Sequence, residues 1–120
     1  MRTLRACLHA MSVAAILACP AALADDAAMD AEIDFLLESV AASDCIYIRN
    51  GKEHSGAAAR DHLQMKRERG RKYYDTTEEF IERIASKSSW SGKPYRIRCG
   101  DTEEDAGAWF NRALESYRNL

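Results

Sequence analysis

The stretch CIYIRNGKEHS, residues 45–55, contains the clearest signals for the fold of this chain of 120 residues. Its first half, residues 45–49, is rich in β-branched and aromatic side chains, which are typical of strands. Asn50 and Gly51 follow directly, and this dipeptide is typical of a tight turn. The middle of the chain is therefore predicted to form a short strand that ends in a turn.

A second short strand is predicted over residues 95–99, with the sequence YRIRC. Cys45 opens the first strand and Cys99 closes the second, so antiparallel pairing would set the two cysteines opposite each other. Cysteines at such positions lie within bonding distance, and an even pair in an oxidising compartment is most simply a disulfide. Two free thiols are the less favoured alternative, because no Cys-x-x-Cys motif is present. The same register predicts two further cross-strand pairs: Tyr47 with Ile97, and Arg49 with Tyr95.

Helices are predicted from capping residues and from apolar residues that recur at spacings of three and four. A first helix buries one face, made of Met29, Ile33, Leu36, Leu37 and Val40. Ser55 is a good N-cap for a second helix, which runs to about Arg69, where Gly70 ends it.

Two more helices are predicted on either side of the second strand. Thr76 and Glu79 have the spacing of a capping box, and the helix they begin buries Phe80, Ile81, Ile84 and Ala85. The segment SSWSGKPY, residues 88–95, is expected to be a loop, and Thr102 or Asp101 to cap the last helix. That helix buries Ala106, Trp109 or Phe110, Ala113, Leu114 and Tyr117. The predicted fold class is α+β: a small, mostly helical domain of about four helices with a short antiparallel two-stranded ribbon and one disulfide.

Residues 1–24 have the features of a signal peptide. Two arginines precede the almost wholly apolar or small residues 6–18, and Ala-x-Ala predicts cleavage after Ala24. The apolar run is shorter than the roughly 20 residues that span a bilayer, so the chain is not expected to be membrane-spanning. A lipid anchor at Cys19, which lies in a loose lipobox, is the less favoured alternative. Residues 25–120 are expected to form a single domain in the periplasm or outside the cell.

Charge is distributed unevenly along the chain. Residues 25–44 contain seven acidic and no basic side chains, whereas residues 49–72 contain eight basic and three acidic ones. The favoured interpretation is an acidic helix beside a basic one, with a solvated surface elsewhere. The alternative is an anion site for phosphate head groups or glycan carboxylates. Nucleic acid is not an expected partner, because the chain without residues 1–24 has 15 basic and 19 acidic side chains.

Neither a catalytic residue nor a metal site is predicted. Ser55 and His62 share a helix face, but seven residues separate them by roughly 10 Å along the axis, too far for a Ser/His dyad. His54 and His62 are eight residues apart, whereas zinc sites on helices favour a spacing of four. His62 is more simply a half-buried core histidine.

The sequence resembles the YfeK-like family of small exported bacterial proteins over nearly all of residues 25–120. The matching segments are CIYIRNGKEHS, then His62-Leu63 with Lys66, and SSWSGKPY ahead of Cys99. The family is a domain of unknown function. The resemblance therefore implies that the protein is exported and carries two cysteines after its signal peptide. It supplies no activity and no cofactor.

A polar pocket is predicted where the two loops RNGKEHS and SSWSGKPY adjoin one end of the ribbon. Trp90 is expected to be a packing residue. We favour a non-enzymatic binding or structural module of the cell envelope, with an anionic ligand or a protein as its partner. A small hydrolase or metal-dependent enzyme that uses His54 or His62 is the alternative. The candidate ligand-binding residues are Arg49, Asn50, Glu53, His54, His62, Lys66, Lys93 and Tyr95.

Overall fold

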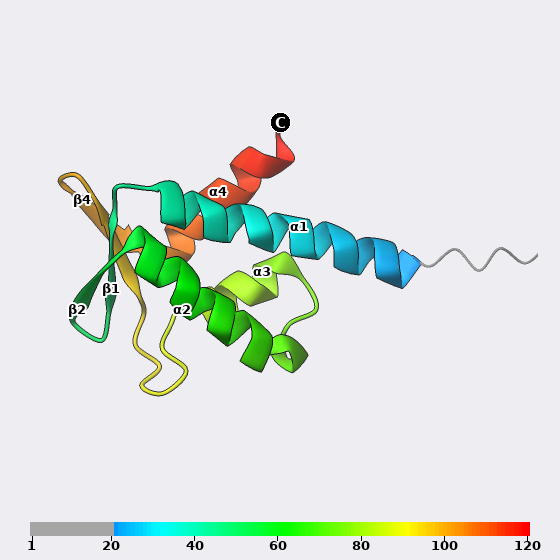
Figure 1. The fold of residues 1–120 in the computed structure, drawn as a ribbon, viewed down its shortest axis with the longest axis horizontal. Coiled ribbons are helices and arrows are strands. Elements are labelled where there is room, and N and C mark those ends of the chain that lie inside the picture. The colour runs from blue at the N-terminus through cyan, green and yellow to red at the C-terminus, as the bar shows by residue number, and fades with distance from the viewer. Residues whose placement is uncertain (1–20) are drawn as a thin grey trace, which may run out of the picture.

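The computed structural model describes residues 21–120, and its strands form one antiparallel sheet. The strands are β1 (Ile46–Arg49), β2 (Lys52–Ser55), β3 (Arg96–Cys99) and β4 (Thr102–Asp105), in the spatial order β2-β1-β3-β4 (Figure 1). The predicted ribbon is the central pair, β1 and β3, in the predicted register with Tyr47 opposite Ile97. Cys45 and Cys99 form the predicted disulfide across its end, with their Cα atoms 4.3 Å apart.

The two outer strands extend the predicted ribbon to a sheet of four. Their sequences, KEHS and TEED, are polar and mostly exposed, so they lack the alternation of apolar residues that identifies a strand. Instead, a two-residue turn connects each outer strand to its neighbour and sets their pairing. Between β1 and β2, Asn50 and Gly51 have φ angles of 49° and 78°, as a type I′ turn requires. Between β3 and β4, Gly100 has a φ angle of 62°. Because β4 occupies residues 102–105, the N-cap position of the last helix is Asp105 and not Thr102 or Asp101, and the Asp105 side chain makes no capping hydrogen bond.

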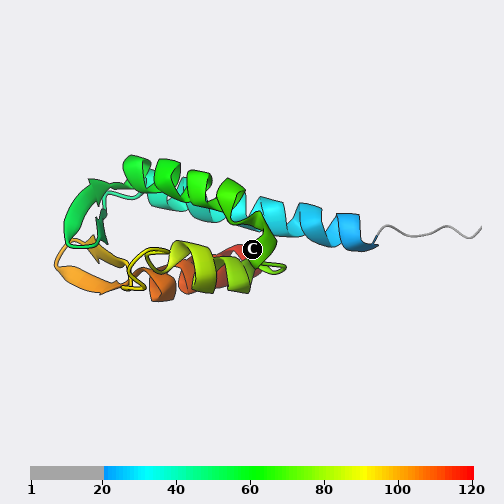
Figure 2. The ribbon, with the colours of Figure 1, turned by 90° about the horizontal axis from the view of Figure 1, so that it is seen from below.

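Four helices pack in two layers behind the sheet. Figure 2 shows α1 (Ala21–Ala42) and α2 (Gly56–Arg69) in one layer, with α3 (Thr77–Phe80) and α4 (Ala106–Arg118) in the other. A short 3-10 turn, η1 (Arg71–Tyr73), links the layers, and α3 continues directly into the π-helix η2 (Ile81–Ala85). The α+β class is confirmed.

The caps and buried faces follow the sequence closely. The Ser55 hydroxyl accepts a hydrogen bond from the Ala58 amide at 3.1 Å, and Thr76 accepts one from the Glu79 amide at 3.1 Å. The core contains the whole predicted face of α1 and, from the last helix, Phe110 in preference to Trp109, which is half-buried. Trp90 was expected to pack, and this expectation is wrong: its side chain is 93 % exposed.

None of the helices within residues 21–120 has the length and hydropathy of a membrane span. Most of the predicted signal peptide and the possible lipid anchor at Cys19 lie outside the described residues. Export and cleavage after Ala24 therefore stay predictions.

Candidate functional site

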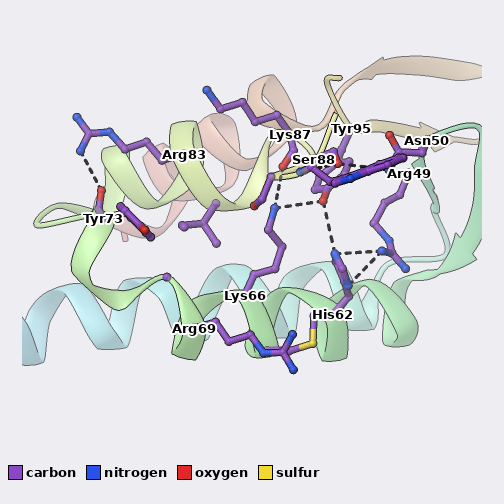
Figure 3. Close-up of a pocket in the computed structure, with 15 residues that line it drawn as sticks. Arg49, Asn50, His62, Lys66, Arg69, Tyr73, Arg83, Lys87, Ser88 and Tyr95 are labelled. Atoms are coloured by element: carbon purple, nitrogen blue, oxygen red, sulfur yellow. Dashed lines mark hydrogen bonds between the residues drawn. The ribbon is translucent and has the colours of Figure 1, made fainter. Parts of the chain in front are cut away.

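A cleft of about 720 Å³ opens between α2 and the segment that runs from η2 to β3. Figure 3 shows Lys66 rising from α2 toward Tyr95 and the backbone of Lys87, with Arg49 and His62 side by side at one end. Tyr73 and Arg83 lie at the other end (Figure 3). The lining residues are Arg49, Asn50, His62, Met65, Lys66, Arg69, Gly70, Tyr73, Arg83, Ile84, Lys87, Ser88, Ser89, Trp90 and Tyr95.

Lys66 lies at the centre of this cleft and is only 8 % exposed. Its ammonium group donates hydrogen bonds to the Lys87 carbonyl at 2.7 Å and to the Tyr95 hydroxyl at 3.1 Å, and it lies 4.8 Å from the centre of the Tyr95 ring. Burial, with smaller contributions from the charges of Arg49 and Lys87, lowers the pKa of Lys66 to about 8. Within residues 21–120, the ammonium group thus contacts neutral groups and forms no ion pair with a carboxylate.

His62 lies one helical turn before Lys66 and contacts Arg49. The Arg49 Nη1 atom is 3.1 Å from His62 Nδ1 and 3.0 Å from Nε2, and the Tyr95 hydroxyl is 3.5 Å from Nε2. Burial, followed by the charges of Arg49 and Lys66, lowers the pKa of His62 to about 4, so the imidazole is neutral at pH 7. A neutral imidazole can accept a hydrogen bond from the guanidinium at one nitrogen. Arg49 is thus held by a neutral partner, and its Nε atom is buried without a hydrogen-bond partner among residues 21–120.

The charge on the cleft wall is of one sign. Five basic residues line it, Arg49, Lys66, Arg69, Arg83 and Lys87, and no acidic residue does. Arg83 is paired with Glu79 at 2.5 Å, and no ion pair within residues 21–120 joins the other four to a carboxylate.

On the opposite face of α2, the basic residues Arg60 and Arg67 form ion pairs with acidic residues of α1. Arg67 is 2.6 Å from Asp34 and 3.2 Å from Asp30, and Arg60 is 3.8 Å from Glu38, so both pair with α1. The acidic helix does lie beside the basic one, as expected from the sequence. Its carboxylates neutralise the face of α2 that they touch and leave the cleft face unpaired.

The two predicted loops meet at the Arg49 end of the cleft. The Ser91 hydroxyl donates to the Asn50 side-chain carbonyl at 2.7 Å, and the Asn50 amide donates to the Ser88 hydroxyl at 3.4 Å. The turn of the first hairpin is thus tied to the loop over residues 88–95, which forms one wall of the cleft.

The cleft brings together five of the eight candidate residues: Arg49, Asn50, His62, Lys66 and Tyr95. The other three, Glu53, His54 and Lys93, do not line it. Glu53 instead forms an ion pair with Arg98 of β3 at 2.8 Å.

Sequence reasoning missed Arg69, Tyr73, Arg83, Lys87, Ser88 and Trp90 as members of this site. Residue 69 follows residues 62 and 66 on one face of α2, so extending the helical spacing would have found it. Arg83 and Lys87 come from η2 and the loop after it, and only the packing of that segment against α2 brings them to the cleft.

Residues 21–120 contain neither a metal-binding cluster nor a hydrogen-bonded Ser/His pair. No cluster of three or more His, Cys, Asp or Glu side chains there is placed to hold a metal ion. The hydrogen-bond partners of His62 are Arg49 and Tyr95, and no serine in that part of the chain is hydrogen-bonded to His54 or His62.

Comparison with known proteins places the chain among proteins without an assigned activity. The model of a family described as "Family of unknown function (DUF5329)" matches residues 27–118. A relative from Salmonella typhimurium, the "Uncharacterized protein YfeK", is 39% identical over 84 residues, which cover 69% of this chain and 70% of the relative. No solved structure matches the chain.

Proposed function

The chain belongs to the DUF5329 family of unknown function, and from the geometry of its cleft we propose that it binds an anionic ligand there without transforming it. One observation carries this proposal: the buried ammonium group of Lys66 lies in a cleft with basic and no acidic side chains on its wall. The ligand would present a phosphate or carboxylate group of a small component of the cell envelope.

The energetic argument starts from the cost of an unpaired buried charge. A buried cation without a counter-ion destabilises the fold, and the lowered pKa of Lys66 reports this cost. An anion between Arg49 and Lys66 would supply the missing opposite charge and would accept charge-assisted hydrogen bonds, each worth about 1.5–3 kcal/mol. The Nε atom of Arg49 is also buried without a hydrogen-bond partner among residues 21–120, which adds to the cost of the ligand-free site.

A binding role is favoured over a catalytic one by the groups in the cleft. The neutral imidazole of His62 is engaged by Arg49 and Tyr95 and is hydrogen-bonded to no serine or cysteine within residues 21–120. Charged and hydroxyl donors converge there instead, which is the arrangement of a recognition site.

Calorimetric titration with inorganic phosphate at low ionic strength tests the proposal with a matched pair of variants. Lys87 lines the cleft and Lys93, in the same loop, does not, so Lys87→Gln and Lys93→Gln remove the same charge inside and outside the site. We expect Lys87→Gln to raise the Kd about threefold and Arg49→Gln to raise it about tenfold or more, with Lys93→Gln close to the wild type.

Equal effects of Lys87→Gln and Lys93→Gln would mean that phosphate responds only to net charge, and would overturn the assignment to the cleft. Absence of saturable binding to the wild type would overturn the proposal itself.

We also propose that the domain works outside the cytoplasm. The signal-peptide features of residues 1–24 and the Cys45–Cys99 disulfide support this, because disulfides persist in oxidising compartments. Expression of the full chain in a bacterium, followed by osmotic shock and intact-mass analysis, tests it. A released protein that begins at Asp25 is expected; retention in the cytoplasm with residues 1–24 attached would contradict it.

A further inference from the structure

Trp90 is an exposed aromatic side chain at a site that otherwise consists of charges and hydroxyl groups. Two large aromatic residues within residues 21–120 are exposed, Trp90 at 93 % and Tyr73 at 56 %, and both line the cleft. Exposing an indole forgoes the favourable burial of a large apolar surface. Its position on the cleft wall makes its apolar surface available to a ligand in the cleft.

The loop that carries Trp90 is fixed by hydrogen bonds. The Ser88 amide donates to the Lys93 carbonyl and the Gly92 amide to the Ser88 carbonyl, both at 2.9 Å. The Ser88 hydroxyl accepts from the amides of Trp90 at 3.3 Å and Ser91 at 3.2 Å. These bonds order the backbone that carries Trp90, which lowers the entropic cost of ordering the loop when a ligand binds.

The groups beside Trp90 are suited to a hydroxylated ring. Asn50, Ser88 and Ser89 line the same cleft, together with the cations of Arg49 and Lys66. A sugar ring has an apolar face of C–H groups and a rim of hydroxyl groups, so an aromatic face and short polar side chains complement it together. A hydrocarbon ligand would leave these polar groups unpaired at a cost.

We propose that the ligand of the cleft is a sugar unit that carries a phosphate or carboxylate group. The anionic group lies between Arg49 and Lys66, and the sugar ring stacks on Trp90. This inference rests on the proposed anion site and adds the chemical class of its ligand.

The test uses the fluorescence of Trp90 itself. The chain has two tryptophans, so Trp109→Phe leaves Trp90 as the single emitter, and Trp109 does not line the cleft. The probes are glucose 6-phosphate, glucuronic acid, inorganic phosphate and glucose. We expect both sugar anions to change the Trp90 emission saturably, and inorganic phosphate to bind more weakly without this change.

Calorimetry on the wild type and on Trp90→Ala gives an independent measurement that does not need the Trp109 variant. We expect Trp90→Ala to raise the Kd for glucose 6-phosphate about tenfold and the Kd for inorganic phosphate less than twofold.

The outcomes separate this inference from the proposed function. If inorganic phosphate binds through Arg49 and Lys87 but glucose 6-phosphate binds no more tightly and ignores Trp90→Ala, the anion site stands and the sugar assignment is overturned. If neither phosphate nor the sugar anions bind, both are overturned. Tight binding of glucose alone would overturn the role of the anionic group.

Discussion

At the scale of single residues, Lys66 is buried and carries a charge that none of its contacts neutralises. Its stem is covered by the helical layers, while its ammonium group reaches a carbonyl and a phenol. A buried lysine without a carboxylate partner is costly, and proteins retain such groups at functional sites more often than elsewhere. The residue therefore gives the most direct link between the stability of the fold and the proposed binding.

The lowered pKa of Lys66 predicts that anion binding weakens as the pH rises through about 8. Below that pH the ammonium group is charged and attracts the anion; above it the neutral amine does not. We expect the Kd for sulfate, whose own charge is constant in this range, to rise about fivefold between pH 7 and pH 9.

Lys66→Met keeps an apolar stem and removes the titrating group, so it is the control for this pH dependence. This variant should bind sulfate weakly at pH 7 and show a much smaller change up to pH 9. A wild-type affinity that does not vary between pH 7 and pH 9 would contradict the role given to Lys66.

At the scale of elements, the start of α2 depends on a close approach to α1. A Cβ atom placed on Gly56 would lie 2.1 Å from the backbone oxygen of Val40, which only a shift of the helix could relieve. We expect Gly56→Ala to lower the free energy of unfolding by about 3 kcal/mol, measured by urea denaturation.

Gly107→Ala makes the same change at the start of α4 and is the matched control. Its added Cβ would lie 3.1 Å from the Ser86 Cβ, a contact that a small adjustment can relieve. The expected loss is below about 1 kcal/mol. If both variants lost the same free energy of unfolding, the close approach of α1 and α2 at Gly56 would not be the cause of the destabilisation.

The helices could be predicted from the sequence because their signals are local. Ser55 and Thr76 cap the helices that their hydroxyl groups predict, and the apolar face of α1 is buried at the predicted positions. The strands β2 and β4 gave no such signal, because KEHS and TEED are polar edge strands held by turns. Mistaking β4 for the first turn of the last helix followed from the same cause.

The site was partly predictable for a related reason. Arg49 and Asn50 come from a strand and its turn, His62 and Lys66 share one helix face, and Tyr95 directly precedes β3, so the spacing of residues locates all five. Lys87, Ser88 and Trp90 depend on how an irregular loop folds back over α2. Loop conformation is set by tertiary contacts such as the bonds from Asn50, and no local pattern encodes them.

At the scale of the whole molecule, residues 21–120 form two similar halves. In each half, a helix leads into a hairpin and the hairpin leads into a second helix. The strands and the final helix of the second half start 50 residues after their counterparts in the first half. The starting residues are Ile46 and Arg96 for β1 and β3, Lys52 and Thr102 for β2 and β4, and Gly56 and Ala106 for α2 and α4. The antiparallel pairing of β1 with β3 joins the halves, and the disulfide Cys45–Cys99 crosslinks them there.

The halves differ in the link between their first helix and their hairpin. This link is residues 43–45 in the first half and residues 86–95 in the second. The longer link contains Lys87, Ser88, Ser89, Trp90 and Tyr95, all of which line the cleft. The added loop therefore forms one wall of the cleft against α2 and contributes Lys87 to its basic residues.

The most direct test of the central claim, that this cleft binds an anion, is an NMR titration of the 15N-labelled protein with inorganic phosphate. We expect saturable shifts in the backbone amides of residues 49–50, 62–70 and 83–95, with little change in β4 and α4. Shifts that do not saturate, or that spread over the outer face of α2 and both hairpins, would contradict the account.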